Sequence, residues 1–267
     1  MTQNIQEQNI KLMRLMKQAI DDNLLVPGFH SLLQTHFPSR KTYLLSCNLK
    51  TATGQIIPYK SLRKLATMAD MGAALDRWMV KTGLQTLKRM HLEQPEANII
   101  IPQSASSLHN REYPRWLDRQ SSREDVSIRG LIISFRLSQI AKNLKLSSEC
   151  ISGLHQLEIN TMIDSFTTHP AALKILKAMG SRYMSAAPAL LKENDDTIKR
   201  IINTCHRHSI LILLPGINRA EDVNLCWSFG ADLLEGNYIH PPPKTPTSVF
   251  HLLSYKPCND RLSPAPV

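Results

Sequence analysis

Arginines at a regular four-residue spacing are the first side chains in this sequence that could do chemistry. Arg111, Arg115, Arg119 and Arg123 would lie along one face of a helix, where their guanidinium groups would attract a phosphate. The same spacing is also typical of a solvated helix face on which acidic neighbours such as Glu112 balance the charge. We favour the solvated face, because charged helix faces are more often solvated than used as phosphate sites.

Histidines and cysteines do not form a metal site or a disulfide framework in the sequence. His206 and His208 lie two residues apart near the predicted end of a helix, so they cannot share a metal as an i, i+4 pair would. The five cysteines are widely separated and form no C-x-x-C pair. Cys47 lies in a predicted strand without a neighbouring His or Lys base, so we expect a core residue. We therefore expect reduced thiols and no cofactor.

The elements that must position any site alternate regularly along the chain. Short apolar runs, typical of buried parallel strands, are separated by amphipathic helical segments. Strands are predicted at 24–27, 41–47, 98–101, 131–135, 161–163, 182–184, 210–214 and 231–234. Helices are predicted at 5–22, 59–90, 113–119, 137–157, 171–179, 195–208 and 219–229. So many strand–helix units in a chain of 267 residues favour a closed α/β barrel over an open sheet.

Composition limits the classes of partner and the location. The net charge of +10 and the pI near 9.5 would suit an anionic partner such as a nucleic acid, a nucleotide or a membrane surface. Lys and Arg are scattered, however, and no RNP-like or helix-turn-helix motif occurs, so a solvated basic surface is the simpler interpretation. Because no run of about 18 apolar residues occurs, we expect no membrane span and a cytoplasmic protein.

Three segments, in matching order and spacing, carry a family resemblance. They read M-A-D-M-G-A-A-L-D-R-W-M-V at 68–80, I-P-Q-S-A-S-S-L at 101–108 and G-A-D-L-L-E-G-N-Y-I-H-P-P at 230–242. They resemble the A-E-x-x-G-L-I-x-x-L-D-x-W-V-L helix, the V-N-x-S-x-x-S-L turn and the closing G-C-D-x-x-Q-G-Y-x-F-x-x-P of the EAL family, the cyclic di-GMP phosphodiesterases. The resemblance implies an EAL-type (β/α)8 TIM-like barrel at 23–255, with an amphipathic helix or linker at 1–22 and a disordered tail at 256–267.

The chemistry implied by this resemblance is metal-assisted hydrolysis of a phosphodiester, in which carboxylates and one amide hold two divalent metals. Hard divalent cations require oxygen ligands. Several positions that the resemblance assigns to metal ligands carry no side-chain oxygen, namely Leu44, Pro102, Arg136 and Pro215. The catalytic lysine position holds Ser185. The resemblance therefore implies a member of the family that has lost its catalytic residues and is not an enzyme.

A vestigial pocket is what the remaining motif positions imply. The position of the phosphate-gripping arginine holds Asn48, one carboxylate of the family's acidic pair survives as Asp164, and Glu235 replaces a glutamine. Together with Arg136, these residues are our candidates for ligand binding. Freed of a metal, Asp164 is expected to pair with Arg136 on the adjacent strand, within about 6 Å.

The family's FimX-type members, which keep the barrel and hydrolyse nothing, are the nearest likeness. This likeness implies that the chain is a regulatory or adaptor domain that acts through a protein partner. Its role would be in cyclic di-GMP signalling, type IV pilus control or motility. Two alternatives stay open, a weak cyclic di-GMP-binding effector and a basic nucleic-acid-binding protein. Active hydrolysis conflicts with the missing metal ligands.

Overall fold

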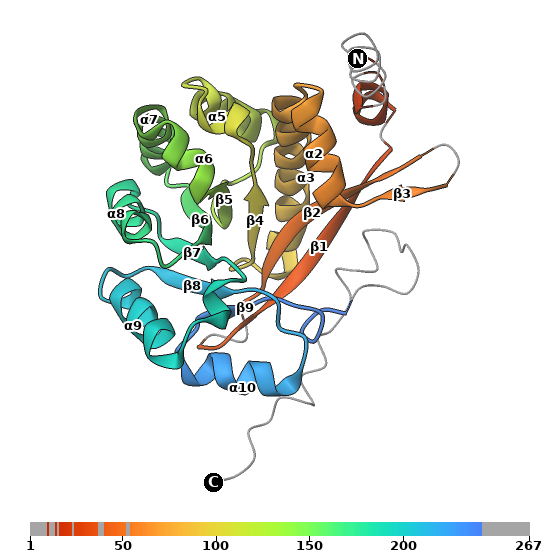
Figure 1. Ribbon diagram of the computed structural model, residues 1–267. Coiled ribbons are helices and arrows are strands. Elements are labelled where there is room, and N and C mark those ends of the chain that lie inside the picture. Colours follow the sequence, from red (N-terminus) through yellow and green to blue (C-terminus); the bar gives the residue numbers. More distant parts are fainter. Residues whose placement is uncertain are drawn as a thin grey trace, which may run out of the picture.

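The computed structural model describes residues 10, 14, 16–22, 24–36, 40–51 and 54–241 of the chain. Within these ranges the strands close into a barrel that helices surround (Figure 1). The tail predicted at 256–267 lies outside the described residues, as does part of the helix predicted at 5–22. Residues 16–21 are helical, and Met16 and Ala19 are fully buried in the core, as an amphipathic helix requires.

Strand directions in the barrel follow from the lengths of the connections. The order is β1-β9-β8-β7-β6-β5-β4-β2, and β1 also pairs with β2, so the sheet closes on itself. Pairings from β2 round to β9 are parallel, whereas β1 is antiparallel to both neighbours. The link from Gln34 to Thr42 is too short for a parallel crossover, which needs about a dozen residues or more. The strands are β1 (Leu25–Gln34), β2 (Thr42–Lys50), β4 (Asn98–Pro102), β5 (Leu131–Arg136), β6 (Asn160–Phe166), β7 (Tyr183–Ala186), β8 (Leu211–Leu214) and β9 (Leu233–Leu234), and β3 (Ile56–Ile57) pairs with β2 as a hairpin.

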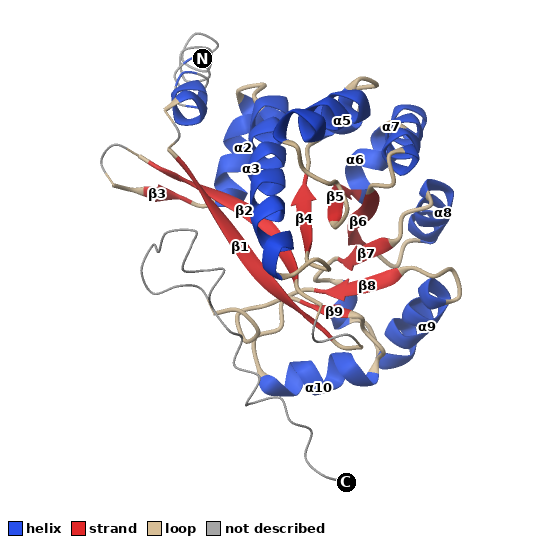
Figure 2. Ribbon diagram, turned by 180° about the vertical axis from the view of Figure 1, so that it is seen from behind, coloured by secondary structure: helices blue, strands red, loops and turns tan. Residues whose placement is uncertain are grey.

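Helices cover the outside of the barrel (Figure 2). They are α2 (Tyr59–Met68), α3 (Gly72–Glu93), α4 (Ala105–Leu108), α5 (Tyr113–Glu124), α6 (Leu137–Lys142), α7 (Leu144–Gln156), α8 (Pro170–Met179), α9 (Asp195–His206) and α10 (Ala220–Ser228), with a 3₁₀ turn at Leu190–Lys192. Within the described residues, no helix combines the length and the apolar character needed to cross a membrane.

The helical stretch predicted at 59–90 is two helices, so the sequence prediction was wrong at this point. Asp70 adopts a left-handed conformation with φ of 53°. The N–H of Met71 donates to the carbonyl of Ala66 at 2.7 Å, which closes the end of α2. Aspartate tolerates this conformation better than most residues. The strand predicted at 24–27 also continues to Gln34.

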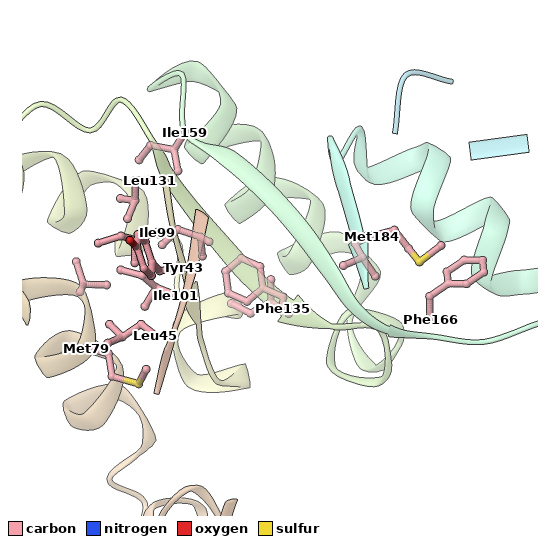
Figure 3. Packing of buried hydrophobic residues seen from close by; sticks show 14 of the residues in the cluster. Tyr43, Leu45, Met79, Ile99, Ile101, Leu131, Phe135, Ile159, Phe166 and Met184 are labelled. Carbon is pink, nitrogen blue, oxygen red and sulfur yellow. The ribbon is translucent and has the colours of Figure 1, made fainter. Parts of the chain in front are cut away.

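Apolar side chains form one layer inside the barrel and another between strands and helices. Successive residues of a strand face opposite sides, so Leu44 packs on the inner layer and Leu45 on the outer one. Figure 3 shows Leu45 of β2 near Met79 of α3 in the outer layer. The buried residues of the inner layer are Leu32, Ile100, Ile132, Met162, Tyr183, Leu213 and Leu233.

Candidate functional site at the carboxyl ends of the strands

A ring of small and polar residues follows the inner apolar layer toward the carboxyl ends of the strands. Residues two positions apart on a strand face the same side, so the residue two positions after each inner apolar residue also faces the inside. Counted from Leu44 and from the inner residues of β4 to β9, these are Ser46, Pro102, Ser134, Asp164, Ser185, Pro215 and Glu235. In barrels of this kind the carboxyl ends of the strands carry the ligand sites. Two of the candidates predicted from the resemblance, Asp164 and Glu235, belong to this ring.

Arg136 and Asp164 form an ion pair near the carboxyl ends of β5 and β6. They are directly opposite each other on the parallel strands β5 and β6. Arg136 Nε lies 3.7 Å from Asp164 Oδ2, and the hydroxyl of Ser165 donates to the same oxygen at 3.1 Å. The predicted pairing is therefore confirmed. A guanidinium group now balances the one carboxylate that the resemblance retains from the family's acidic pair.

Glu235 brings a second carboxylate close to Asp164. Burial raises the pKa of the Glu235 carboxyl, and the negative charge of Asp164 raises it further. Both influences favour the protonated form of Glu235. The structure thus brings Arg136 and Asp164 together on the neighbouring strands β5 and β6, and Glu235, which follows β9, lies close enough to interact with the charge of Asp164.

Asn48, which the resemblance places at the position of the phosphate-gripping arginine, makes a hydrogen bond to helix α2. Its side-chain oxygen accepts the backbone N–H of Tyr59, the first residue of α2, at 3.1 Å. The residue before α2, Pro58, gives the helix no side-chain cap. Asn48 on β2 therefore caps the helix across space, and its acceptor oxygen is engaged there.

Two histidines lie beside the site, and neither was predicted from the sequence as a site residue. His30 Nε2 is 2.9 Å from the hydroxyl oxygen of Ser46, and its ring meets the ring of His240 edge-on at 5.9 Å between centroids. Burial lowers the pKa of both imidazoles, and His240 lowers that of His30 further. Neutral imidazoles are therefore expected near pH 7. His240 lies in the closing 230–242 segment, which was the only sequence signal for either residue.

A second cation lies at the end of β4, and it was also missed from the sequence. Arg63 of α2 donates to the carbonyl of Gln103 at 3.2 Å and lies 5.6 Å from the ring centroid of Tyr59. No motif marks this arginine, because its neighbours come from segments far apart in the chain.

The donor set at the strand ends does not fit a pair of hard divalent cations. Such cations take several oxygen ligands, chiefly carboxylates. Here Asp164 and Glu235 supply carboxylates, but Asp164 already faces Arg136, and a guanidinium repels a cation. Among the described residues there is also no cluster of three or more His, Cys, Asp or Glu side chains that could hold a metal. The residues present therefore do not fit the metal pair that the resemblance implies.

A family model decides the classification. Residues 14–242 match the model of the EAL domain. This chain belongs to the EAL domain family. The EAL barrel expected from the sequence segments is therefore confirmed.

Relatives of this EAL domain are distant in sequence and close in fold. An uncharacterized 76.5 kDa protein in the phbC 3′ region of Thiocystis violacea is 18% identical over 243 residues, which are 91% of this chain and 35% of that protein. The chain thus spans about a third of that relative's length. The FimX EAL domain from Pseudomonas aeruginosa bound to c-di-GMP has a TM-score of 0.80 at 19% identity, covering 90% of this chain and 99% of that one. The PaMucR phosphodiesterase in complex with c-di-GMP has a TM-score of 0.75 at 16% identity, covering 94% and 100%. At these identities the likeness establishes a shared fold.

Proposed function

We propose that this EAL domain is a non-catalytic regulatory domain in cyclic di-GMP signalling, and that it acts by binding a protein partner. The observation that carries the proposal is the Arg136–Asp164 ion pair, 3.7 Å long, at the strand ends. Metal-assisted phosphodiester hydrolysis needs cations that polarise the phosphate and activate water. In this domain Arg136 balances the charge of the Asp164 carboxylate. The carboxylate therefore takes part in a fixed ion pair and does not serve as a metal ligand.

The structural relatives support a role for this domain in cyclic di-GMP signalling. The FimX EAL domain from Pseudomonas aeruginosa was solved bound to c-di-GMP, and PaMucR in complex with the same ligand. In this chain Arg136 and Arg63 remain as cations at the strand ends. These cations support a weak cyclic di-GMP-binding effector as the second candidate.

Cyclic di-GMP is expected to bind with a Kd weaker than about 10 µM, or less than about 7 kcal/mol of binding free energy. Asn48 replaces a phosphate-gripping arginine, and its amide oxygen caps α2. Pro102 and Pro215 have no backbone N–H to donate. Stacking contributes about 1–3 kcal/mol per base on aromatic platforms, which leaves little after the entropic cost of association.

Isothermal titration calorimetry at physiological salt measures this affinity. The FimX EAL domain from Pseudomonas aeruginosa serves as the positive control, and Arg119→Ala, which removes an exposed arginine on α5, as the matched variant. A saturable sub-micromolar isotherm that Arg136→Ala abolishes and Arg119→Ala leaves intact would replace the proposal with a working nucleotide sensor.

A further inference from the structure

A groove separates two neighbouring helices on the outside of the barrel. Helix α8 packs on α7 but makes only sparse contact with α9. Between α8 and α9 lies a cavity of about 390 Å³. Its apolar lining includes Phe166 from the end of β6, Leu173 from α8 and Ile201 from α9. We call this cavity the α8–α9 groove.

The charged side chains along the α8–α9 groove are all cationic. They are Lys174 and Lys177 of α8 and Arg200 of α9, and all three are exposed. None of them forms an ion pair with another side chain in the described part of the protein. The acidic residues of α9, Asp195 and Asp196, are in its first turn and do not line the groove. An apolar cavity bordered by unpaired cations thus faces solvent.

The chemistry of this groove fits an amphipathic helix with acidic flanks. Apolar side chains at i, i+3 and i+4 of such a helix would fill a cavity lined by Leu173 and Ile201, as in other helix-in-groove complexes. Acidic side chains beside them would pair with Lys174, Lys177 and Arg200 and would set the orientation. We propose that the α8–α9 groove docks an acidic amphipathic helix of a protein partner. This inference rests on the proposed partner-binding function and names the surface and the partner's chemistry.

Other occupants fit the groove less well. A second copy of this chain would also carry a net charge of +10 and would be repelled. A nucleic acid could pair its phosphates with the cations but has no aliphatic side chains to fill the apolar cavity. A membrane surface meets protruding residues, whereas Phe166 is only 2% exposed at the groove.

Fluorescence anisotropy with designed helical peptides tests the proposal. The first probe is a labelled peptide of about four turns with Leu at i, i+3, i+4 and i+7 and Glu on both flanks. The second carries Lys in place of each Glu, and the third Ser in place of each Leu. At physiological salt, the native protein is expected to bind the first probe at least about tenfold more tightly than either of the others.

A charge reversal in the groove supplies the decisive variant. The double variant Lys174→Glu, Arg200→Glu is expected to bind the first probe at least about tenfold more weakly than the native protein does. It is expected to bind the Lys-bearing probe more tightly. Arg119→Glu with Arg123→Glu changes the net charge equally on exposed positions of α5 and is expected to leave both affinities unchanged. All four positions are exposed, so these variants should fold.

Several results would overturn the groove proposal. One is that the Arg119→Glu, Arg123→Glu control weakens binding of the first probe as much as the groove variant does. Another is that the Ser-bearing probe binds the native protein as tightly as the first probe does. The third is that the first probe does not bind at about 1 mM. Groove-dependent binding of a duplex DNA oligonucleotide, or of phosphatidylcholine vesicles containing phosphatidylserine, in preference to the peptide would also overturn it. These outcomes leave the non-catalytic assignment standing, whereas hydrolysis of cyclic di-GMP would remove that assignment without affecting the groove.

Discussion

Replacing Asp76 with alanine is expected to lower the free energy of unfolding by about 3 kcal/mol or more, because it leaves several buried donors unsatisfied. Asp76 of α3 is 4% exposed. Its carboxylate accepts the backbone N–H of Ser104 at 2.9 Å and the hydroxyls of Ser104 and Ser107 at 2.6 Å each. These bonds join α3 to the turn after β4, so their loss affects the whole barrel.

Urea denaturation followed by circular dichroism measures the effect of Asp76→Ala. Glu93→Ala is the control, because it removes an exposed carboxylate from the same helix and should change stability by less than about 0.5 kcal/mol. Equal stability of the two variants would show that the Asp76 hydrogen bonds contribute nothing to the fold.

The ionisation of Asp76 adds a pH dependence with a definite sign. Burial raises the pKa of its carboxyl, and the hydrogen bonds from Ser104 and Ser107 only partly counter this. A group whose pKa is raised on folding contributes stability that is complete below the unfolded pKa of about 3.9 and is lost as the pH rises through the folded pKa. The stability of the native protein relative to Asp76→Asn should therefore increase as the pH falls from neutrality. The opposite trend would mean that hydrogen bonding outweighs burial.

Gly236→Ala is expected to destabilise the protein by about 3 kcal/mol or more, at the upper end of overpacking effects. A Cβ atom at Gly236 would overlap the backbone N, C and O atoms of Ile217. That backbone cannot shift easily, because Ile217 donates to the carbonyl of Glu235 at 2.9 Å and accepts from the N–H of Tyr238 at 3.1 Å. Two chain segments cross here without room for a side chain.

Gly216→Ala provides the matched control for this prediction. Gly216 has a φ of +85°, but a Cβ atom added there would meet no other atom within 4 Å, so its substitution costs only backbone strain of about 1 kcal/mol. Thermal unfolding of both variants should show the larger loss at position 236. A Gly236→Ala protein as stable as Gly216→Ala would contradict the steric argument.

The resemblance places these two glycines at glycine positions of the family's A-E-G-V-E and Q-G-Y motifs, whereas it places other residue types at the ligand positions. Gly216 and Gly236 meet backbone requirements, a left-handed conformation and a close crossing, which persist whether or not the barrel does chemistry. A metal ligand has no such structural constraint. Pro102, Arg136 and Pro215 accordingly stand where the resemblance places oxygen ligands.

Patterns within single segments predicted most of the fold. The apolar runs at 131–135 and 210–214 became the buried strands β5 and β8, because a continuous apolar run is what a strand covered on both faces requires. The antiparallel β1 was not predicted as such, although its short link to β2 determines its direction. The break at Asp70 was missed because it depends on one residue's backbone conformation within a continuous amphipathic pattern.

The contacts of the site could be predicted from the sequence only where two residues lie opposite each other on neighbouring strands. The Arg136–Asp164 pair follows from parallel strands in register, so the resemblance was enough to place both residues. The hydrogen bond from the backbone N–H of Tyr59 to Asn48 joins residues 11 positions apart in the sequence, and the one between His30 and Ser46 joins residues 16 positions apart. Such contacts depend on how a helix and a hairpin pack, which periodicity does not encode.

Hydrolysis of cyclic di-GMP is the most direct measurement of the central claim that this EAL domain is non-catalytic. The purified protein is incubated with cyclic di-GMP and Mg²⁺ or Mn²⁺ over a range of pH, with PaMucR phosphodiesterase as the positive control and a metal-free sample as the blank. The account predicts no linear dinucleotide above the blank at any pH, because Leu44, Pro102, Arg136 and Pro215 supply no side-chain oxygen for a metal pair. Metal-dependent formation of the linear product would contradict the account.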